Sequence, residues 1–392
     1  MRKTIKRLYS TALFKEFFEN EKSSGLVLIG CTLISLLLAN SSFATEYLHI
    51  WHMKLGTESL EYWINDGLMT IFFLLIGLEL EREIYIGELA NIKEALLPIF
   101  AALGGMLIPA GIYLALNVGT AAHSGAGIPM ATDIAFALGV LSLLGNRVPL
   151  SLKVFLTALA VIDDLGAILV IAIFYTKSLS WMNLGIAMGI LLFLFILNRM
   201  KIKNLIPYLI GGAIMWYFML NSGIHATITG VLLAFVIPFG DGSSRSVSYR
   251  LQHYLHKPVA FFILPLFALA NTAIVLGDDI VDALHLHYSM GIMLGLVLGK
   301  PIGITLFSFI VVTIGLCKLP NDLNWKKIIS VGFLGGIGFT MSIFVTLLAF
   351  DDLHIINNAK FIILISSLIA GCIGFLALKQ NLKNKKQHAV SN

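Results

Sequence analysis

The stretch "LAVIDDLGAILVIAIF", from Leu159 to Phe174, is apolar except for two adjacent carboxylates, Asp163 and Asp164. An aspartate at the centre of a membrane helix costs roughly 2.5–3.5 kcal/mol on insertion scales. Two ionised neighbours also repel each other. Because packing alone gives no reason to keep such a pair, we expect both side chains to have a function if this stretch crosses a membrane.

The composition of the chain is that of a membrane protein. Of its 392 residues, 58% are hydrophobic and 12% are charged, whereas soluble domains have about 25% charged residues. The 35 glycines fit closely packed membrane helices. The formal net charge of +5 comes from basic residues that are scattered along short loops, which argues against nucleic-acid binding.

Apolar segments long enough to cross a bilayer follow one another along the chain. A helix needs about 20 apolar residues to cross about 30 Å of hydrocarbon. Because the connections are short, residues 1–392 are expected to form a single membrane domain, with an amphipathic surface segment at 8–22 and a basic C-terminal tail at 380–392. The sequence predicts an all-α polytopic membrane protein with twelve transmembrane helices, at 24–40, 62–80, 95–117, 121–145, 151–176, 181–198, 204–221, 224–239, 254–276, 289–315, 327–350 and 357–379.

The distribution of lysine and arginine predicts the orientation. Cytoplasmic loops are enriched in these residues. Most of the 27 lysines and arginines fall in alternate segments, beginning with the N-terminus, whereas Lys54, Lys177 and Lys360 fall in the others and Lys300 belongs to no loop. The bias therefore predicts an even number of spans, with both termini in the cytoplasm.

Four ionisable residues are expected near the bilayer midplane. Asp163 and Asp164 lie about 12 residues, or about 18 Å, from either end of their span. Asp133 and Lys300 are central in theirs. Together they can line one polar cavity in which Lys300 offsets an aspartate. A structural ion pair between helices is the alternative, although one lysine cannot neutralise both Asp163 and Asp164.

Two of the predicted spans contain glycine- and proline-rich interruptions. The fourth reads "SGAGIPMATDIAFALG" around Thr132 and Asp133, and the eleventh reads "GFLGGIGFTMSIF" around Thr340. Unwound backbone is tolerated at membrane depth where it is shielded or lines a cavity. Each broken span is the middle one of a triplet, spans 3–5 and 10–12, which points to inverted repeats with a transport site between them. Asp133 is expected to neutralise helix N-termini there, and Lys300 helix C-termini.

The motifs "ATDIAFALGVLSLLG", "ALAVIDDLGAI", "SGIHAT", "LGKPIGI" and "GIGFTMSIF" resemble those of the NhaA family of bacterial sodium/proton antiporters, in order and along most of the chain. The resemblance implies twelve helices in the inner membrane, of which the fourth and eleventh are broken and cross. It implies that Asp163 and Asp164 bind Na⁺ and protons, with Asp133, Lys300, Thr132 and Thr340 as supporting groups.

The resemblance also implies a homodimer that forms partly through an outward β-hairpin. The hairpin would lie at about 45–58, within "EYLHIWHMKLGTESLEY". There Leu48, Ile50 and His52 alternate with His49, Trp51 and Met53, the period of a strand. An ordinary solvated loop is the alternative.

A pH-responsive cluster on the cytoplasmic side is a further implication of the resemblance. Histidine changes its charge near neutral pH and can act as a switch. The sequence departs from the family pattern at Gln252, where the family has Glu, and at Glu81, where it has Lys, and both departures fall in or beside this cluster. The matching residues are Glu79, Arg82, Glu83, His253 and His256. His225, which lies in "SGIHAT" just inside a predicted span, is a further candidate for the pH response.

The combined prediction is a secondary transporter, and not an enzyme, that exports Na⁺ and also Li⁺ in exchange for H⁺, with roles in sodium and pH homeostasis. Carboxylates bind both small hard cations and protons, so the two substrates compete and exchange should switch on as pH rises. Exchange should be electrogenic if the two carboxylates bind one proton each in one state and share one Na⁺ in the other. No cofactor is expected. A cation channel is the alternative. An intramembrane aspartyl protease is a remote one, because Asp163 and Asp164 are adjacent on one helix and cannot face each other across a gap.

Overall fold

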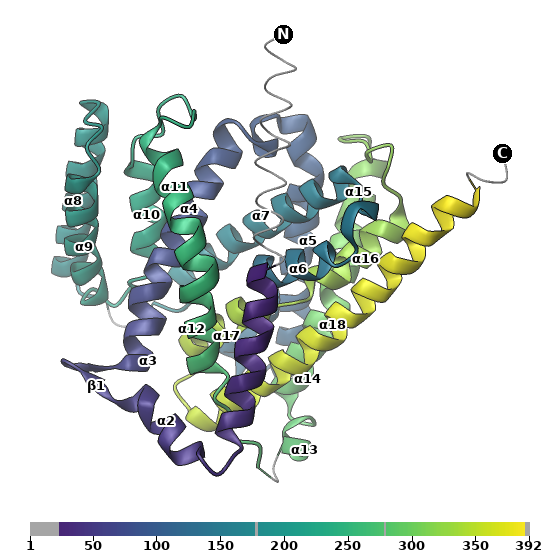
Figure 1. Ribbon diagram of the computed structural model, residues 1–392, viewed down its shortest axis with the longest axis horizontal. Coiled ribbons are helices and arrows are strands. Elements are labelled where there is room, and N and C mark those ends of the chain that lie inside the picture. Colours follow the sequence, from purple (N-terminus) through teal and green to yellow (C-terminus); the bar gives the residue numbers. More distant parts are fainter. Residues whose placement is uncertain (1–22, 177–178, 278–279, 389–392) are drawn as a thin grey trace.

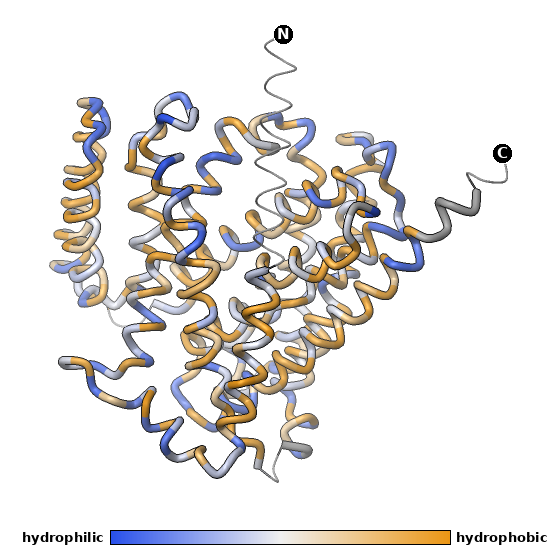
Figure 2. Tube along the Cα trace, viewed as in Figure 1, coloured by the Kyte–Doolittle hydropathy of each residue, from blue (hydrophilic) through white to orange (hydrophobic). Residues whose placement is uncertain are grey.

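The structure, a computed structural model, describes residues 23–176, 179–277 and 280–388, and most of the described chain is helical. Apolar runs form helices because every backbone N–H and C=O in hydrocarbon must be hydrogen-bonded within the protein. Figure 1 shows how the helices are arranged, and Figure 2 shows hydrophilic residues gathered near the ends of many of them. The predicted amphipathic segment at 8–22 lies outside the described residues.

Eight helices of the described chain are long and apolar enough to cross a membrane. Several of them join two or three labelled elements in one run. They are Leu60–Tyr85 (α3, Leu60–Tyr62; η1, Trp63–Leu68; α4, Met69–Tyr85), α5 (Ile92–Asn117), His123–Ser142 (η3, His123–Met130; α6, Ile134–Ser142), α7 (Leu150–Phe174), α8 (Trp181–Arg199), Val247–Asn271 (α11, Val247–Pro258; η5, Val259–Ile263; α12, Leu264–Asn271), His287–Thr313 (α14, His287–Leu294; η6, Gly295–Gly299; α15, Lys300–Thr313) and Leu353–Leu382 in α18 (Leu353–His388).

Two further pairs of helices reach this length when each pair is counted as one. They are Ser23–Ala39 with α2 (Ala44–His52), bent by 116°, and α16 (Trp325–Gly335) with α17 (Phe339–Ala349), bent by 48°. The predicted spans at 204–221 and 224–239 contain the shorter helices α9 (Ile206–Leu220) and α10 (Ile228–Val236). Short connecting helices are η2 (Glu88–Ala90), η4 (Gly145–Arg147) and α13 (Ile280–Ala283). By length and composition the described chain thus has eight to ten spans, and twelve stays a prediction.

The predicted outward hairpin is present but much shorter than expected. Its strands are β1 (Lys54–Leu55) and β2 (Glu58–Ser59), which pair antiparallel. The residues before them form α2 instead of a strand. Tyr47 and Trp51, four residues apart, are both buried and their ring centroids lie 5.7 Å from each other. This helical spacing of the two aromatic anchors outweighs the alternating pattern of the neighbouring residues.

Close backbone packing of α5 against α15 positions the charged residues at the centre of the molecule. Gly104 on α5 and Gly303 on α15 face each other so closely that a Cβ atom on either would lie about 2 Å from the carbonyl oxygen of the other. Lys300 is the first residue of α15 and therefore lies one turn from this contact. The packing holds the Lys300 side chain against α5, where its Cδ would lie 3.7 Å from a Cβ atom at Gly105.

The C-terminal helix is longer than predicted. The predicted span ends at 379 and is followed by a basic tail from 380, but α18 continues to His388. Figure 1 shows this helix running along one side of the molecule. The first part of the predicted tail is therefore helical.

Candidate functional site

The interruptions predicted in the fourth and eleventh spans are present, and their backbones contact each other. Between η3 and α6, residues 131–133 belong to no helix, and residues 336–338 separate α16 from α17. The N–H of Asp133 donates to the carbonyl of Ile337 over 2.7 Å. The two unwound stretches therefore satisfy part of each other's backbone hydrogen bonding, as the hydrocarbon environment requires.

Asp133 caps the N-termini of two half-helices at this contact. Its Oδ1 accepts from the N–H of Phe136 on α6 over 2.9 Å. Its Oδ2 accepts from the N–H of Thr340 on α17 over 3.2 Å and from the Thr340 hydroxyl over 2.5 Å. The side chain is buried. The carboxylate therefore lies at both N-termini, where the partial positive charge of a helix is found.

Lys300 forms a buried ion pair with Asp163. The chain reaches it through η6, a π-helical turn, and π turns often occur at functional sites. Its Nζ lies 2.5 Å from Asp163 Oδ2 and donates to the Thr132 hydroxyl over 2.9 Å. The side chains of Lys300 and Asp163 are fully buried. Three segments, η3–α6, α7 and α15, thus each contribute one member of the cluster.

The expected contact of Lys300 with helix C-termini is indirect. Thr132 Oγ1 lies 2.8 Å from the carbonyl of Gly335, at the C-terminus of α16, and 2.7 Å from Asp163 Oδ2. A hydroxyl has one proton and can donate to one of these oxygens at a time. The Lys300 ammonium pairs with the carboxylate because a full negative charge attracts it more strongly than the partial charge of a carbonyl.

Asp164 has surroundings quite different from those of Asp163. Both of its carboxylate oxygens are buried and have no hydrogen-bond partner among the described residues, and the same holds for Asp163 Oδ1. The charges that act on Asp164 are the carboxylates of Asp163, Asp133 and Glu79 and the ammonium of Lys300. Adjacent residues on a helix point about 100° apart, so only one of the pair reaches Lys300.

This arrangement provides three oxygen atoms for a proton or a small cation. Buried polar atoms in proteins normally have hydrogen-bond partners, so a buried carboxylate oxygen without one is a candidate to bind a proton or a cation. Carboxylate oxygens are suitable ligands for hard cations. The cluster can therefore exchange one kind of positive charge for another, with Lys300 as an internal counter-charge.

Gly166 lies two residues after Asp164, at a position where a glycine can allow another backbone to approach closely. The nearest group is instead the side chain of Met106 on α5, whose Sδ would lie 2.1 Å from a Cβ at position 166. Gly166 therefore packs against a side chain, unlike Gly104 and Gly303, where the backbones of α5 and α15 contact each other. A flexible thioether fills the irregular space beside the aspartates.

The predicted cytoplasmic cluster is largely assembled where α4 packs against α11. Glu79 Oε1 lies 3.9 Å from His256 Nδ1. The Arg82 guanidinium lies over the ring of Tyr249, 5.4 Å from its centroid, and the ring of His253 stacks with the same tyrosine at a centroid distance of 6.4 Å. Tyr249, which sequence reasoning missed, therefore connects Arg82 to His253.

The remaining members of the predicted cluster differ in their positions. Glu83 lies on α4 with its carboxylate beside Gly87. His225 is not with the others: its Nε2 lies 3.0 Å from the carbonyl of Tyr175, just after the C-terminal end of α7. Glu81, one of the two departures from the family pattern, is buried and accepts from the Ser248 hydroxyl over 3.2 Å.

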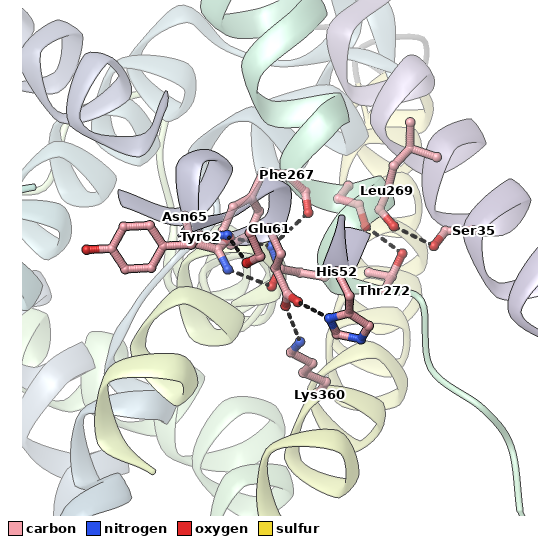
Figure 3. Close-up of polar contacts among 12 residues, drawn as sticks. Ser35, His52, Glu61, Tyr62, Asn65, Phe267, Leu269, Thr272 and Lys360 are labelled. Carbon is pink, nitrogen blue, oxygen red and sulfur yellow. Dashed lines mark hydrogen bonds and ion pairs between the residues drawn. The ribbon is translucent and has the colours of Figure 1, made fainter. Parts of the chain in front are cut away.

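A second polar cluster lies near α2, around His52, Glu61 and Lys360 (Figure 3). Lys360 was expected in a loop, but it lies inside α18, is buried, and points at Glu61, with 3.9 Å between its Nζ and Oε1. Glu61 Oε2 lies 3.9 Å from His52 Nδ1. Nearby, the side-chain amide of Asn271 donates to that of Asn65 over 2.7 Å. The sequence carried one signal, since Lys360 interrupts the last apolar run.

Comparison with known proteins places these observations in one family. A family model described as "Na+/H+ antiporter 1" matches residues 15–378. The chain is 74% identical to the Na⁺/H⁺ antiporter NhaA of Flavobacterium psychrophilum over 374 residues, which cover 95% of this chain and 97% of that protein.

Two further relatives agree. The chain is 66% identical to the Na⁺/H⁺ antiporter NhaA 1 of Flavobacterium johnsoniae over 376 residues, 96% of this chain and 99% of that protein. It is 63% identical to the Na⁺/H⁺ antiporter NhaA of Cytophaga hutchinsonii over 373 residues, 95% of this chain and 96% of that protein. The chain therefore belongs to the NhaA family of Na⁺/H⁺ antiporters, which are secondary transporters and not enzymes.

Proposed function

We propose that this protein exports Na⁺ in exchange for H⁺ at Asp163 and Asp164. The observation that carries the proposal is the set of three buried carboxylate oxygens without a hydrogen-bond partner in the described chain, Asp163 Oδ1 and both oxygens of Asp164. A carboxylate binds either a proton or Na⁺. The family membership supports Na⁺ and H⁺ as the two substrates.

Competition between the substrates is the proposed mechanism. When the carboxylates face outward they take protons and release Na⁺, and when they face inward they release protons and take Na⁺. For Na⁺ to reach Asp163, the ion pair with Lys300 must lengthen, and Thr132 can turn its hydroxyl proton from Asp163 Oδ2 to the carbonyl of Gly335. Two half-helix pairs that meet around a fixed site allow access to alternate by a rocking motion.

The supporting residues have electrostatic roles in this proposal. Asp133 and Thr340 hold the N-termini of α6 and α17 together. Lys300 supplies the positive charge beside Asp163, and the Thr132 hydroxyl hydrogen-bonds with both side chains. None of these four needs to bind Na⁺. The proton gradient supplies the energy.

The broader assignment extends the same proposal. We place the protein in the bacterial inner membrane, with both termini in the cytoplasm, twelve spans in a single transporter domain and inverted repeats in spans 3–5 and 10–12. Li⁺, which is small and hard like Na⁺, should be a second cation substrate. The exposed strand β1 can pair with the same strand of a second copy, which favours a homodimer.

Purified protein in liposomes tests the function directly. An outward-directed Na⁺ gradient should drive proton uptake, measured with a pH dye, and an imposed pH gradient should drive uptake of ²²Na⁺ in the opposite sense. Both fluxes should saturate with Na⁺. Na⁺ flux that does not move protons and does not saturate would indicate a channel and would contradict the proposal.

A further inference from the structure

A cavity of about 760 Å³ lies away from the aspartates, where the first turns of α5 and α7 meet the connection between α15 and α16. Its size falls in the range of ligand sites in proteins. Its walls are mainly apolar, and two exposed lysines, Lys93 and Lys318, belong to the lining. The lining residues include Leu97, Pro98, Val154, Phe155, Ala158 and Leu316.

The rim of the cavity is suited to the boundary between hydrocarbon and water. Leu150 and Leu316 belong to the lining and each has 52% of its surface exposed, so apolar side chains continue outward from the cavity. The N-terminal ends of α5 and α7 and the connection between α15 and α16 all lie on the proposed cytoplasmic side of the membrane. A ligand with an apolar part can therefore enter from the lipid.

Charge at the rim favours an anion. Lys93 and Lys318 line the cavity and are exposed, while Glu94 is the one carboxylate among the described lining residues, which leaves a net charge of +1. Glu94 lies in the first turn of α5, where the helix N-terminus stabilises its negative charge. The lysines remain for a ligand.

The start of α7 adds hydrogen-bond donors to this charge. Pro149 precedes the helix and provides no side-chain cap. The hydroxyl oxygen of Ser151 lines the same cavity, is buried and has no hydrogen-bond partner among the described residues. An anion at this position would meet a hydroxyl donor and the positive end of a helix as well as two ammonium groups.

We propose that this cavity binds a phospholipid with a net negative headgroup, such as phosphatidylglycerol, from the cytoplasmic leaflet. The phosphate lies between Lys93 and Lys318 near Ser151, and part of an acyl chain lies against Val154, Phe155 and Leu316. Basic pockets between membrane helices on the cytoplasmic side are suited to anionic headgroups. The occupant would contact α7, the helix that carries Asp163 and Asp164.

The test measures phospholipid binding to delipidated protein in detergent by native mass spectrometry. The probes are phosphatidylglycerol and phosphatidylethanolamine with the same acyl chains, and inorganic phosphate. The double variant Lys93→Gln/Lys318→Gln should bind phosphatidylglycerol about 25-fold more weakly than the parent, since each lysine near an anionic headgroup contributes about fivefold. The matched control Lys203→Gln/Lys326→Gln removes two exposed lysines that do not line the cavity, and should bind like the parent.

Two single variants test the apolar part of the cavity and its charge separately. Val154→Phe fills the apolar part and should weaken phosphatidylglycerol binding while every charge is kept. Glu94→Gln removes the repelling carboxylate and should strengthen it. Equal binding by the double variant and its control would overturn the proposal. So would protection against thermal unfolding by inorganic phosphate alone, or a preference for phosphatidylethanolamine that Glu94→Gln abolishes.

Discussion

At the scale of single residues, the two adjacent aspartates have unequal surroundings. Asp163 is paired with Lys300 and hydrogen-bonded to Thr132, whereas neither oxygen of Asp164 has a partner among the described residues. The difference follows from the helix, because neighbouring side chains point in different directions. It leads to different expectations for the two positions.

Replacement of either aspartate by asparagine should abolish exchange. Asp164→Asn should leave folding almost unchanged, because a neutral amide is cheaper to bury than an unpaired charge. Asp163→Asn should lower thermal stability as well, since it leaves Lys300 buried without its partner. Na⁺-driven proton flux in liposomes and thermal unfolding in detergent measure the two effects. Near-normal flux in either variant would remove that residue from the site.

Lys300 should be replaceable by arginine but not by leucine. Lys300→Arg keeps the charge opposite Asp163 and should retain substantial flux. Lys300→Leu should lose most of the flux and destabilise the fold by about 3–5 kcal/mol, the cost of leaving one member of a buried ion pair alone. The loss of stability should shrink at acid pH, because a protonated Asp163 is neutral and can be buried without a positive partner. A leucine variant as stable and active as the parent at pH 8 would contradict both roles.

At the scale of elements, four half-helices meet at the unwound residues around Asp133. One carboxylate caps α6 and α17 together, and one hydroxyl, that of Thr132, lies between the C-terminus of α16 and the Asp163–Lys300 pair. N-terminal caps contribute about 1 kcal/mol each. The more important consequence is geometric, since the caps fix where the half-helices end and hence where the charged side chains meet.

The packing of α5 against α15 should be sensitive to a single methyl group. Gly104→Ala brings a Cβ to about 2 Å from the Gly303 carbonyl, and the helices must separate. We expect a fall in thermal stability and in exchange, because Lys300 moves with α15. Gly111→Ala, on the same helix, is the matched control: no atom lies within 4 Å of the added Cβ. It should stabilise the protein by about 0.5–1 kcal/mol through helix propensity. Equal effects of the two variants would contradict the packing argument.

At the scale of the whole molecule, the stoichiometry decides the response to voltage. Two carboxylates that bind one proton each in one state and share one Na⁺ in the other move net positive charge inward with the protons. A potential that is negative inside should then accelerate Na⁺ export. The measurement is ²²Na⁺ flux in liposomes with a potential set by K⁺ and valinomycin, while the pH difference is held at zero. A rate independent of voltage would exclude the unequal exchange.

The pH dependence should come mainly from competition at the aspartates. As pH falls, protons occupy the carboxylates and Na⁺ cannot bind from inside. At very alkaline pH, no proton binds from outside. Exchange should therefore rise through neutral pH, and the rise should shift to lower pH as the Na⁺ concentration increases. Proton flux measured against pH at several Na⁺ concentrations tests this expectation.

The cluster predicted on the cytoplasmic side would be a second source of pH dependence, because Glu79 Oε1 lies 3.9 Å from His256 Nδ1 and histidine changes its charge near neutral pH. Replacement of His253 and His256 together by glutamine separates the two sources. Competition predicts that the double variant keeps the parent profile. A profile that ignores the Na⁺ concentration but moves in the double variant would instead favour a dedicated sensor.

The amino-acid sequence alone was sufficient to predict most spans, the interruptions in the fourth and eleventh, and the residues that meet at the centre. The physical reason is that the bilayer imposes a length, an apolar composition and a high cost for each charge, and these requirements act on local sequence. A lysine or aspartate in an apolar run is visible without any knowledge of its neighbours. Lys360 carried the same signal within the predicted last span, although it was assigned to a loop.

Contacts between distant segments decided the rest. The alternating residues before β1 form α2 because Tyr47 and Trp51 are buried together, and Asp163 rather than Asp164 meets Lys300 because of how α7 is rotated against α15. The sharing of Asp133 by α6 and α17, and the link from Arg82 through Tyr249 to His253, join residues far apart in the chain. Local sequence specifies which groups are costly to bury, whereas only tertiary packing specifies which partner each of them meets.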